Sequence, residues 1–132
     1  FPGHGIDPDA TVGSLSIAKR QMVEIAMAFS DAGTPPRLVN LDEPTSSLDA
    51  GLSAQLLDHV RRFVREGGSV VLISHILGEV LSTADRIVVM DKGQIIAIGT
   101  HQSLMAENGL YAELARLQFN QTHIESTNNT NT

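Results

Sequence analysis

The feature that most constrains the fold of this chain is a short hydrophobic run that ends in two adjacent carboxylates. Residues 38–41 (LVNL) are followed directly by Asp42 and Glu43. A second run, residues 70–73 (VVLI), is followed by a polar pair that includes His75. An unbroken run such as 70–73 is typical of a strand buried on both faces of a parallel sheet. Because α/β proteins bind ligands at the carboxyl ends of such strands, the pattern predicts a site there.

The segments around these runs predict an α/β domain with a mainly parallel sheet and a β-hairpin after it. Apolar residues at steps of three and four indicate helices, and Asp49 is a suitable N-cap for one of them. The sequence Asp91-Lys92-Gly93 predicts the hairpin turn. The expected elements are a helix over 16–30, a strand over 38–41, a helix from Asp49 to Gly67, a strand over 70–73, a helix over 77–83, strands over 86–90 and 94–98, and a last helix around 110–117.

Composition narrows the possible function classes. The chain has 132 residues, no cysteine and a formal net charge of −6. The lack of cysteine excludes disulfides and thiol chemistry, and the acidic balance argues against a nucleic-acid partner. No apolar run is long enough to cross a bilayer. We predict one domain over residues 1–119 and, because its composition is nearly all polar, a disordered tail over 120–132.

The polar groups at the strand ends have plain structural alternatives. A strand that ends in Asp42 and Glu43 can be a solvated strand end, and a single histidine such as His75 is more often structural or exposed than catalytic. Two strands that deliver such groups to the same sheet edge favour the functional interpretation. In phosphoryl-transfer ATPases, carboxylates in this place hold Mg²⁺ and orient or deprotonate the attacking water.

Four segments in a fixed order resemble the motifs of ABC-type ATPases. Residues 38–44 (LVNLDEP) look like the Walker B strand of that family. Residues 46–49 (SSLD) look like its D-loop, and His75 looks like its switch histidine. Residues 15–21 (LSIAKRQ) stand where the LSGGQ-type signature belongs. The resemblance continues to about Gln118 and implies a P-loop NTPase-like fold with flanking helices around a mainly parallel sheet.

The resemblance also implies a role for each matched residue. Asp42 would assist Mg²⁺, Glu43 would be the catalytic carboxylate, and His75 would contact the γ-phosphate or the attacking water. Serine and backbone N–H groups at a helix N-terminus form an anion site. The residues implied to face the ATP held by a second such domain are Ser16, Ile17 and Ala18, with Asp49 communicating across the dimer. The implied cofactors are ATP and Mg²⁺.

Two departures from the family pattern bear on activity. Ile17 and Ala18 stand where many members carry paired glycines, and they lack the positive-φ freedom of glycine. No GxxxxGKS or GxxxxGKT phosphate loop occurs in the sequence, so we expect an incomplete fold and an inactive isolated chain. The missing phosphate loop, together with a start at Phe1 rather than Met, predicts that the chain is a fragment, the C-terminal portion of an ATPase domain.

The function implied by the resemblance is ATP hydrolysis coupled to solute transport. The implied partners are a second ABC ATPase domain and a membrane-spanning transporter subunit, and the implied location is peripheral, on the cytoplasmic face of the cell (inner) membrane. Residues 21–26 (QMVEIA) resemble bacterial carbohydrate importers, whereas residues 99–114 resemble the ending of many exporters. Two alternatives stay open: a non-catalytic truncated remnant, which the missing phosphate loop favours, and a non-transport ABC ATPase of DNA repair or translation.

Overall fold

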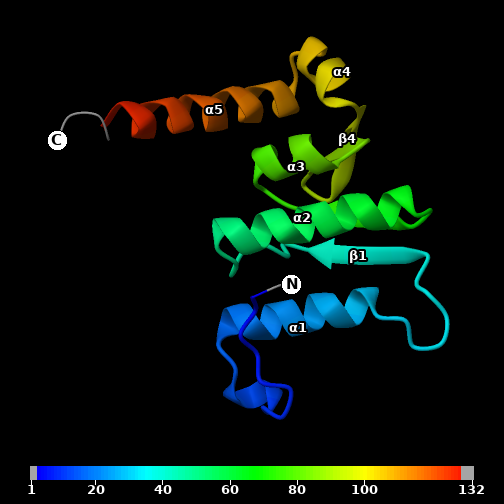
Figure 1. Cartoon of the computed structure of the whole chain (residues 1–132). Helices are drawn as coiled ribbons and strands as arrows, with labels where there is room; N and C mark the ends of the chain where they lie inside the picture. The colour runs from blue at the N-terminus through cyan, green and yellow to red at the C-terminus, as the bar shows by residue number, and fades with distance from the viewer. Residues whose placement is uncertain (1–2, 129–132) are drawn as a thin grey trace. The chain divides into compact units, whose positions relative to one another are not determined.

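The computed structural model describes residues 3–128, with side chains described as far as residue 121. The elements in chain order (Figure 1) are a 3₁₀ turn η1 Val12–Ser14, α1 Ile17–Phe29, β1 Leu38–Asp42, α2 Ala50–Arg65, β2 Ser69–Ile73, α3 Leu77–Thr83, β3 Ile87–Asp91, β4 Gln94–Gly99, α4 His101–Ala106 and α5 Leu110–Asn128. The predicted α/β class, with a parallel strand pair followed by a hairpin, is confirmed.

Two compact units divide the chain, Phe1–His75 and Ile76–Thr132. The single domain that the sequence predicts over residues 1–119 stays a prediction. Each unit contains its own two-stranded sheet. Each unit has its own buried core, in which helices pack on one face of its sheet.

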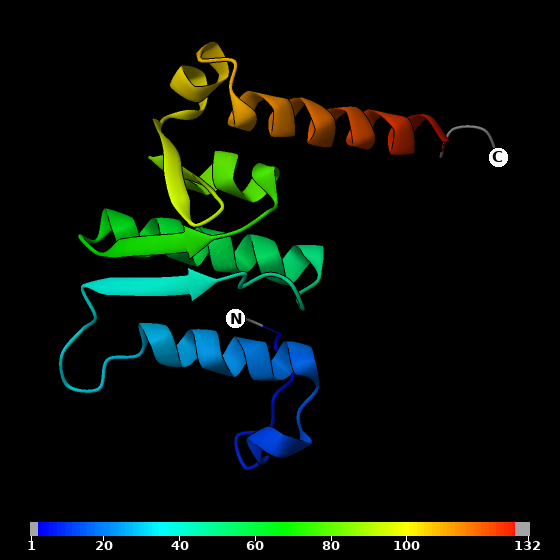
Figure 2. The ribbon, with the colours of Figure 1, turned by 180° about the vertical axis from the view of Figure 1, so that it is seen from behind.

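The first unit packs α1 and α2 against the parallel pair β1–β2. Val39 lies opposite Val70, and Leu41 lies opposite Leu72. Figure 2 shows both strands running in the same direction, as the crossover through α2 requires. The buried residues of this core are Ile25, Val39, Leu41, Leu56 and Val60. The hydrophobic run that ends in two carboxylates is therefore a strand of this core.

β2 departs from the expectation of a strand covered on both faces. Its residues alternate between half-buried and exposed, and the side chains of Val71 and Ile73 are 50% and 47% exposed. Val70 and Leu72 pack on the core of the first unit. The expectation is wrong for this chain because the helices of the unit cover only the face that carries Val70 and Leu72.

The second unit contains the predicted hairpin. β3 and β4 are antiparallel and are joined by Lys92 and Gly93, whose φ angles are 48° and 76°. Positive φ at both central residues defines the type I′ turn, whose twist matches that of the flanking strands. Ile87 and Val89 are buried with residues of α3, α4 and α5. The residues that complete this core are Leu77, Leu104, Tyr111 and Ala115.

The C-terminal segment differs from the disordered tail that its composition favours. The helix α5 continues to Asn128, so residues 120–128 are helical. Tyr111 and Ala115 pack into the core at the start of α5, and each residue added to a formed helix gains a backbone hydrogen bond. Residues 129–132 lie outside the described part of the chain.

Replacing Tyr111 by Phe should lower the free energy of unfolding by about 1 kcal/mol at neutral pH, because the Tyr111 hydroxyl lies 2.9 Å from His101 Nδ1. Burial raises the pKa of Tyr111 above its ordinary value. The hydroxyl of the folded chain therefore stays protonated where the unfolded chain ionises, and this stability is lost as the pH rises above about 10. Denaturant unfolding at neutral and strongly alkaline pH measures both effects. An equal loss of stability at high pH in the two proteins would contradict the prediction.

Candidate functional site

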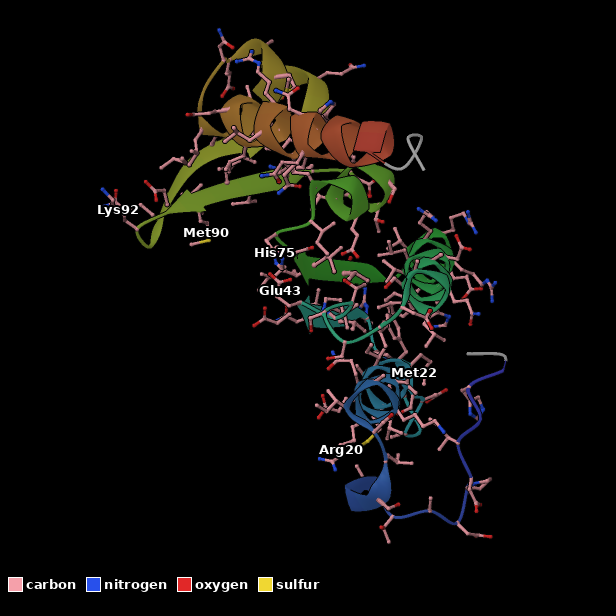
Figure 3. All side chains as sticks on the ribbon, turned by 90° about the vertical axis from the view of Figure 1, so that its left-hand side faces the viewer. Arg20, Met22, Glu43, His75, Met90 and Lys92 are labelled. Atoms are coloured by element: carbon pink, nitrogen blue, oxygen red, sulfur yellow. The ribbon has the colours of Figure 1, made fainter. Side chains whose placement is uncertain are left out.

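The carboxyl ends of β1 and β2 bring Glu43 and His75 together. The amide of Glu43 donates to the carbonyl of Ile73 over 2.8 Å, so the strand pairing extends one residue beyond Asp42. His75 follows β2 by two residues, and its Nδ1 lies 2.9 Å from Oε1 of Glu43. Figure 3 shows the two side chains next to each other at the strand ends. The sheet register therefore decides which carboxylate meets the histidine.

Glu43 has an unusual backbone conformation. Its φ is 46°, in the left-handed region that few residues other than glycine adopt. Such conformations cost about 1 kcal/mol or more and cluster at functional sites. The side chain of Glu43 is 35% exposed and that of His75 is 76% exposed. The pair is thus open to solvent, and the carboxylate is placed to hold the imidazole ring in one orientation.

Asp42 is the exposed last residue of β1. It lines a cavity of about 150 Å³ between α1 and β1, together with Gln21, Glu24 and Asn40. Among the described residues, no group of three or more His, Cys, Asp or Glu side chains is placed to hold a metal ion. A single carboxylate suits Mg²⁺ in phosphoryl-transfer sites, because that ion keeps several waters and takes further ligands from the phosphates of the substrate.

Asp49 lies at the end of the loop that leaves this strand. Its Oδ1 accepts a hydrogen bond of 2.8 Å from the amide of Leu52, so the predicted N-cap of α2 is confirmed. Within the loop, Ser46 and Leu48 donate from their amides to the carbonyls of Glu43 and Thr45. These turns hold the segment after Glu43 in a compact form. Asp49 itself is exposed, and its role across a dimer stays a prediction.

Ser16, Ile17 and Ala18 form the beginning of α1. Ser16 is the N-cap, and its Oγ accepts from the amide of Lys19 over 3.4 Å. Ile17 is 72% exposed. Neither Ile17 nor Ala18 has a positive φ, so the backbone here does not need the glycines that many family members carry. Figures 1 and 2 show that α1 begins at the end of the first unit where β1 and β2 stop.

Arg20 is a residue that the sequence patterns did not single out. Its guanidinium donates to two backbone carbonyls of the preceding segment, Gly13 over 2.7 Å and Leu15 over 3.0 Å. Lys19 makes a similar contact, from Nζ to the carbonyl of Gly5 over 2.8 Å. The only sequence signal was the position of two cationic residues in the first turn of a helix that follows a loop rich in glycine and proline.

Comparisons with known proteins show that most of this chain is similar in sequence to parts of longer proteins. It is 45% identical over 95 residues to the ribose import ATP-binding protein RbsA of Chelativorans sp. (strain BNC1), a match that covers 72% of this chain and 18% of that protein. It is 41% identical over 107 residues to the ATP-dependent lipid A-core flippase of Alkalilimnicola ehrlichii, covering 80% of this chain and 17% of the flippase. The chain therefore spans less than a fifth of the length of either protein. No family model matches it.

A solved structure supports the same relationship. A bacterial Atm1-family ABC exporter with ATP bound matches with a TM-score of 0.58 and 31% sequence identity. The match covers 63% of this chain and 14% of the exporter chain. Within the described residues, no helix is both long enough and apolar enough to cross a membrane.

Proposed function

Because this chain belongs to the ATP-binding proteins of ABC transporters over its matched residues, we propose that it supplies the hydrolytic part of an ATP site. The observation that carries the proposal is the contact of 2.9 Å between Glu43 and His75 at the ends of two parallel strands. Asp42 precedes the pair on β1. In this proposal Glu43 is the general base, His75 is a second polar group beside it, and Asp42 is the carboxylate for Mg²⁺.

In the proposed reaction, water attacks the γ-phosphorus of ATP while the bond to the β-phosphate oxygen breaks. Glu43 takes the proton of the attacking water, and ADP leaves with inorganic phosphate. His75, held by Glu43, contacts the γ-phosphate or the attacking water. Mg²⁺, when bound near Asp42, supplies charge neutralisation for the phosphates.

The proposed assembly contains a second ABC ATPase domain and a membrane-spanning transporter subunit, with this chain peripheral on the cytoplasmic face. Ser16 and the amides of Ile17 and Ala18 would serve the ATP held by the second domain, because they form an exposed helix N-terminus. Carbohydrate import is the proposed transport function, supported by several relatives that are named for ribose import. The flippase relative and the exporter structure support the alternative direction, export.

The proposal is tested in a hybrid protein in which this chain replaces the 95 matched residues of the Chelativorans relative. The host supplies the rest of an ATP-binding protein, which this chain does not cover. With Mg²⁺-ATP, the hybrid should release phosphate, whereas the isolated chain should not, because it has no GxxxxGKS or GxxxxGKT loop to hold the β- and γ-phosphates. Phosphate release is measured for both proteins after purification to constant specific activity.

Two outcomes of this assay would contradict the proposal. Turnover by the isolated chain would show that a phosphate site exists without the loop. A folded hybrid that binds ATP but releases no phosphate would favour the alternative of a non-catalytic remnant, which the missing loop supports.

A further inference from the structure

Arg20 joins the beginning of α1 to the turn that precedes it. Nη2 of Arg20 donates to the carbonyl of Gly13 over 2.7 Å, and Nε donates to the carbonyl of Leu15 over 3.0 Å. The two acceptors lie on either side of Ser14. Gly13 belongs to the 3₁₀ turn η1, and Leu15 is the C-cap of that turn. Figure 3 shows Arg20 at the start of α1, beside this turn. One side chain therefore fixes two points of the segment that enters the helix.

Ser16 lies in the sequence between Arg20 and the two carbonyls, of Gly13 and Leu15, that Arg20 binds. It is the N-cap of α1, and its amide directly follows the carbonyl of Leu15 that Arg20 holds. The turn itself is closed by bonds from the amides of Ser14 and Leu15 to the carbonyls of Thr11 and Val12. Its buried contacts are few, since none of the residues of η1 is buried. The guanidinium bonds therefore constrain the segment before Ser16, whereas the amides of Lys19 and Arg20 hold Ser16 itself from the helix side.

We propose that Arg20 is a positioning residue, which holds Ser16 and the first amides of α1 in the orientation that receives the γ-phosphate of ATP on a second domain. The inference rests on the proposed function. It concerns orientation rather than contact with the nucleotide, because Arg20 uses its Nε and Nη2 donors within its own chain. A planar guanidinium donates to two carbonyls from separate nitrogens in a fixed geometry, whereas the three donors of a lysine ammonium all lie on one nitrogen.

The test uses the hybrid protein and four variants: Arg20→Ala, Arg20→Lys, Ser16→Ala and the double variant Arg20→Ala/Ser16→Ala. Arg20→Ala should lower kcat/KM for ATP about tenfold, the effect expected for two lost hydrogen bonds. Arg20→Lys should recover only part of this loss. The double variant should lose less than the product of the two single losses, because both changes act through the same segment. Arg62→Ala, which removes an exposed arginine from α2, is the matched control and should leave kcat/KM unchanged.

A second measurement separates positioning from stability. Backbone amide exchange at Ser14 and Leu15, whose amides close the turn before Ser16, should become faster in Arg20→Ala, while exchange in β1 stays unchanged. Losses that multiply in the double variant, or unchanged exchange rates at Ser14 and Leu15, would overturn the inference. If Ser16→Arg leaves turnover intact, the proposed function of this segment fails, and the inference fails with it. If Ser16→Arg abolishes turnover while Arg20→Ala matches Arg62→Ala, the inference alone fails.

Discussion

Glu43→Gln in the hybrid protein should slow ATP hydrolysis by at least about 10²-fold while leaving ATP binding intact, because a general base contributes at least this much to such a reaction. Glutamine keeps the size of the side chain and an acceptor oxygen for His75, whose Nδ1 lies 2.9 Å from Oε1 of Glu43. The change removes only the basic carboxylate. Single-turnover phosphate release and equilibrium binding of a fluorescent ATP analogue measure the two quantities.

Two further variants make this result specific. Glu66→Gln changes an exposed glutamate at the end of α2 and should leave hydrolysis unchanged. His75→Ala should also slow turnover, and its effect should shrink in the Glu43→Gln background, because the two side chains act as one unit. Losses that are independent would show that the contact between Glu43 and His75 has no part in the reaction.

Ser16→Arg should abolish most of the turnover of the hybrid by a different route. The larger cationic side chain would fill the space in front of the α1 N-terminus, where the γ-phosphate of the second domain is proposed to bind. We expect ATP binding to each separate domain to persist and ATP-dependent dimer formation to be lost. Sedimentation in the presence of ATP, in the Glu43→Gln background in which hydrolysis is expected to be slow, measures dimer formation directly.

The controls for Ser16 separate crowding from loss of the helix cap. Ser16→Asn preserves a good N-cap, so it should keep α1 stable and retain most of the dimer formation. Ser30→Arg places the same side chain at the opposite end of α1 and should have no effect on the dimer. Loss of dimer formation in Ser30→Arg would show that added charge, rather than the position of Ser16, is responsible.

The two variants together distinguish the possible arrangements of active sites. If Glu43→Gln has no effect and Ser16→Arg abolishes turnover, the site built on β1 of this chain is degenerate. The segment around Ser16 would then serve the active site of the second domain. If neither change affects turnover, the assignment of these residues to ATP hydrolysis is wrong.

The sequence by itself determined the local elements. The hairpin turn at Lys92 and Gly93, the N-cap at Asp49 and the strand that ends at Asp42 were all predicted, because turn geometry, capping and the strand run depend on neighbouring residues. The position of Glu43 and His75 at one sheet edge followed from the same pattern. That expectation rests on the general rule that the carboxyl ends of parallel strands meet at one edge of a sheet.

Only the tertiary structure decided the remaining features. The exposure of Val71 and Ile73 on β2 could not be read from an unbroken apolar run, because burial depends on which faces the helices cover. The direct contact of Glu43 with His75 depends on the register between β1 and β2, which pairs Asp42 with Ile73. The two carbonyls held by Arg20 carry no sequence signal, since backbone acceptors are the same at every residue and only folding selects which of them a side chain reaches.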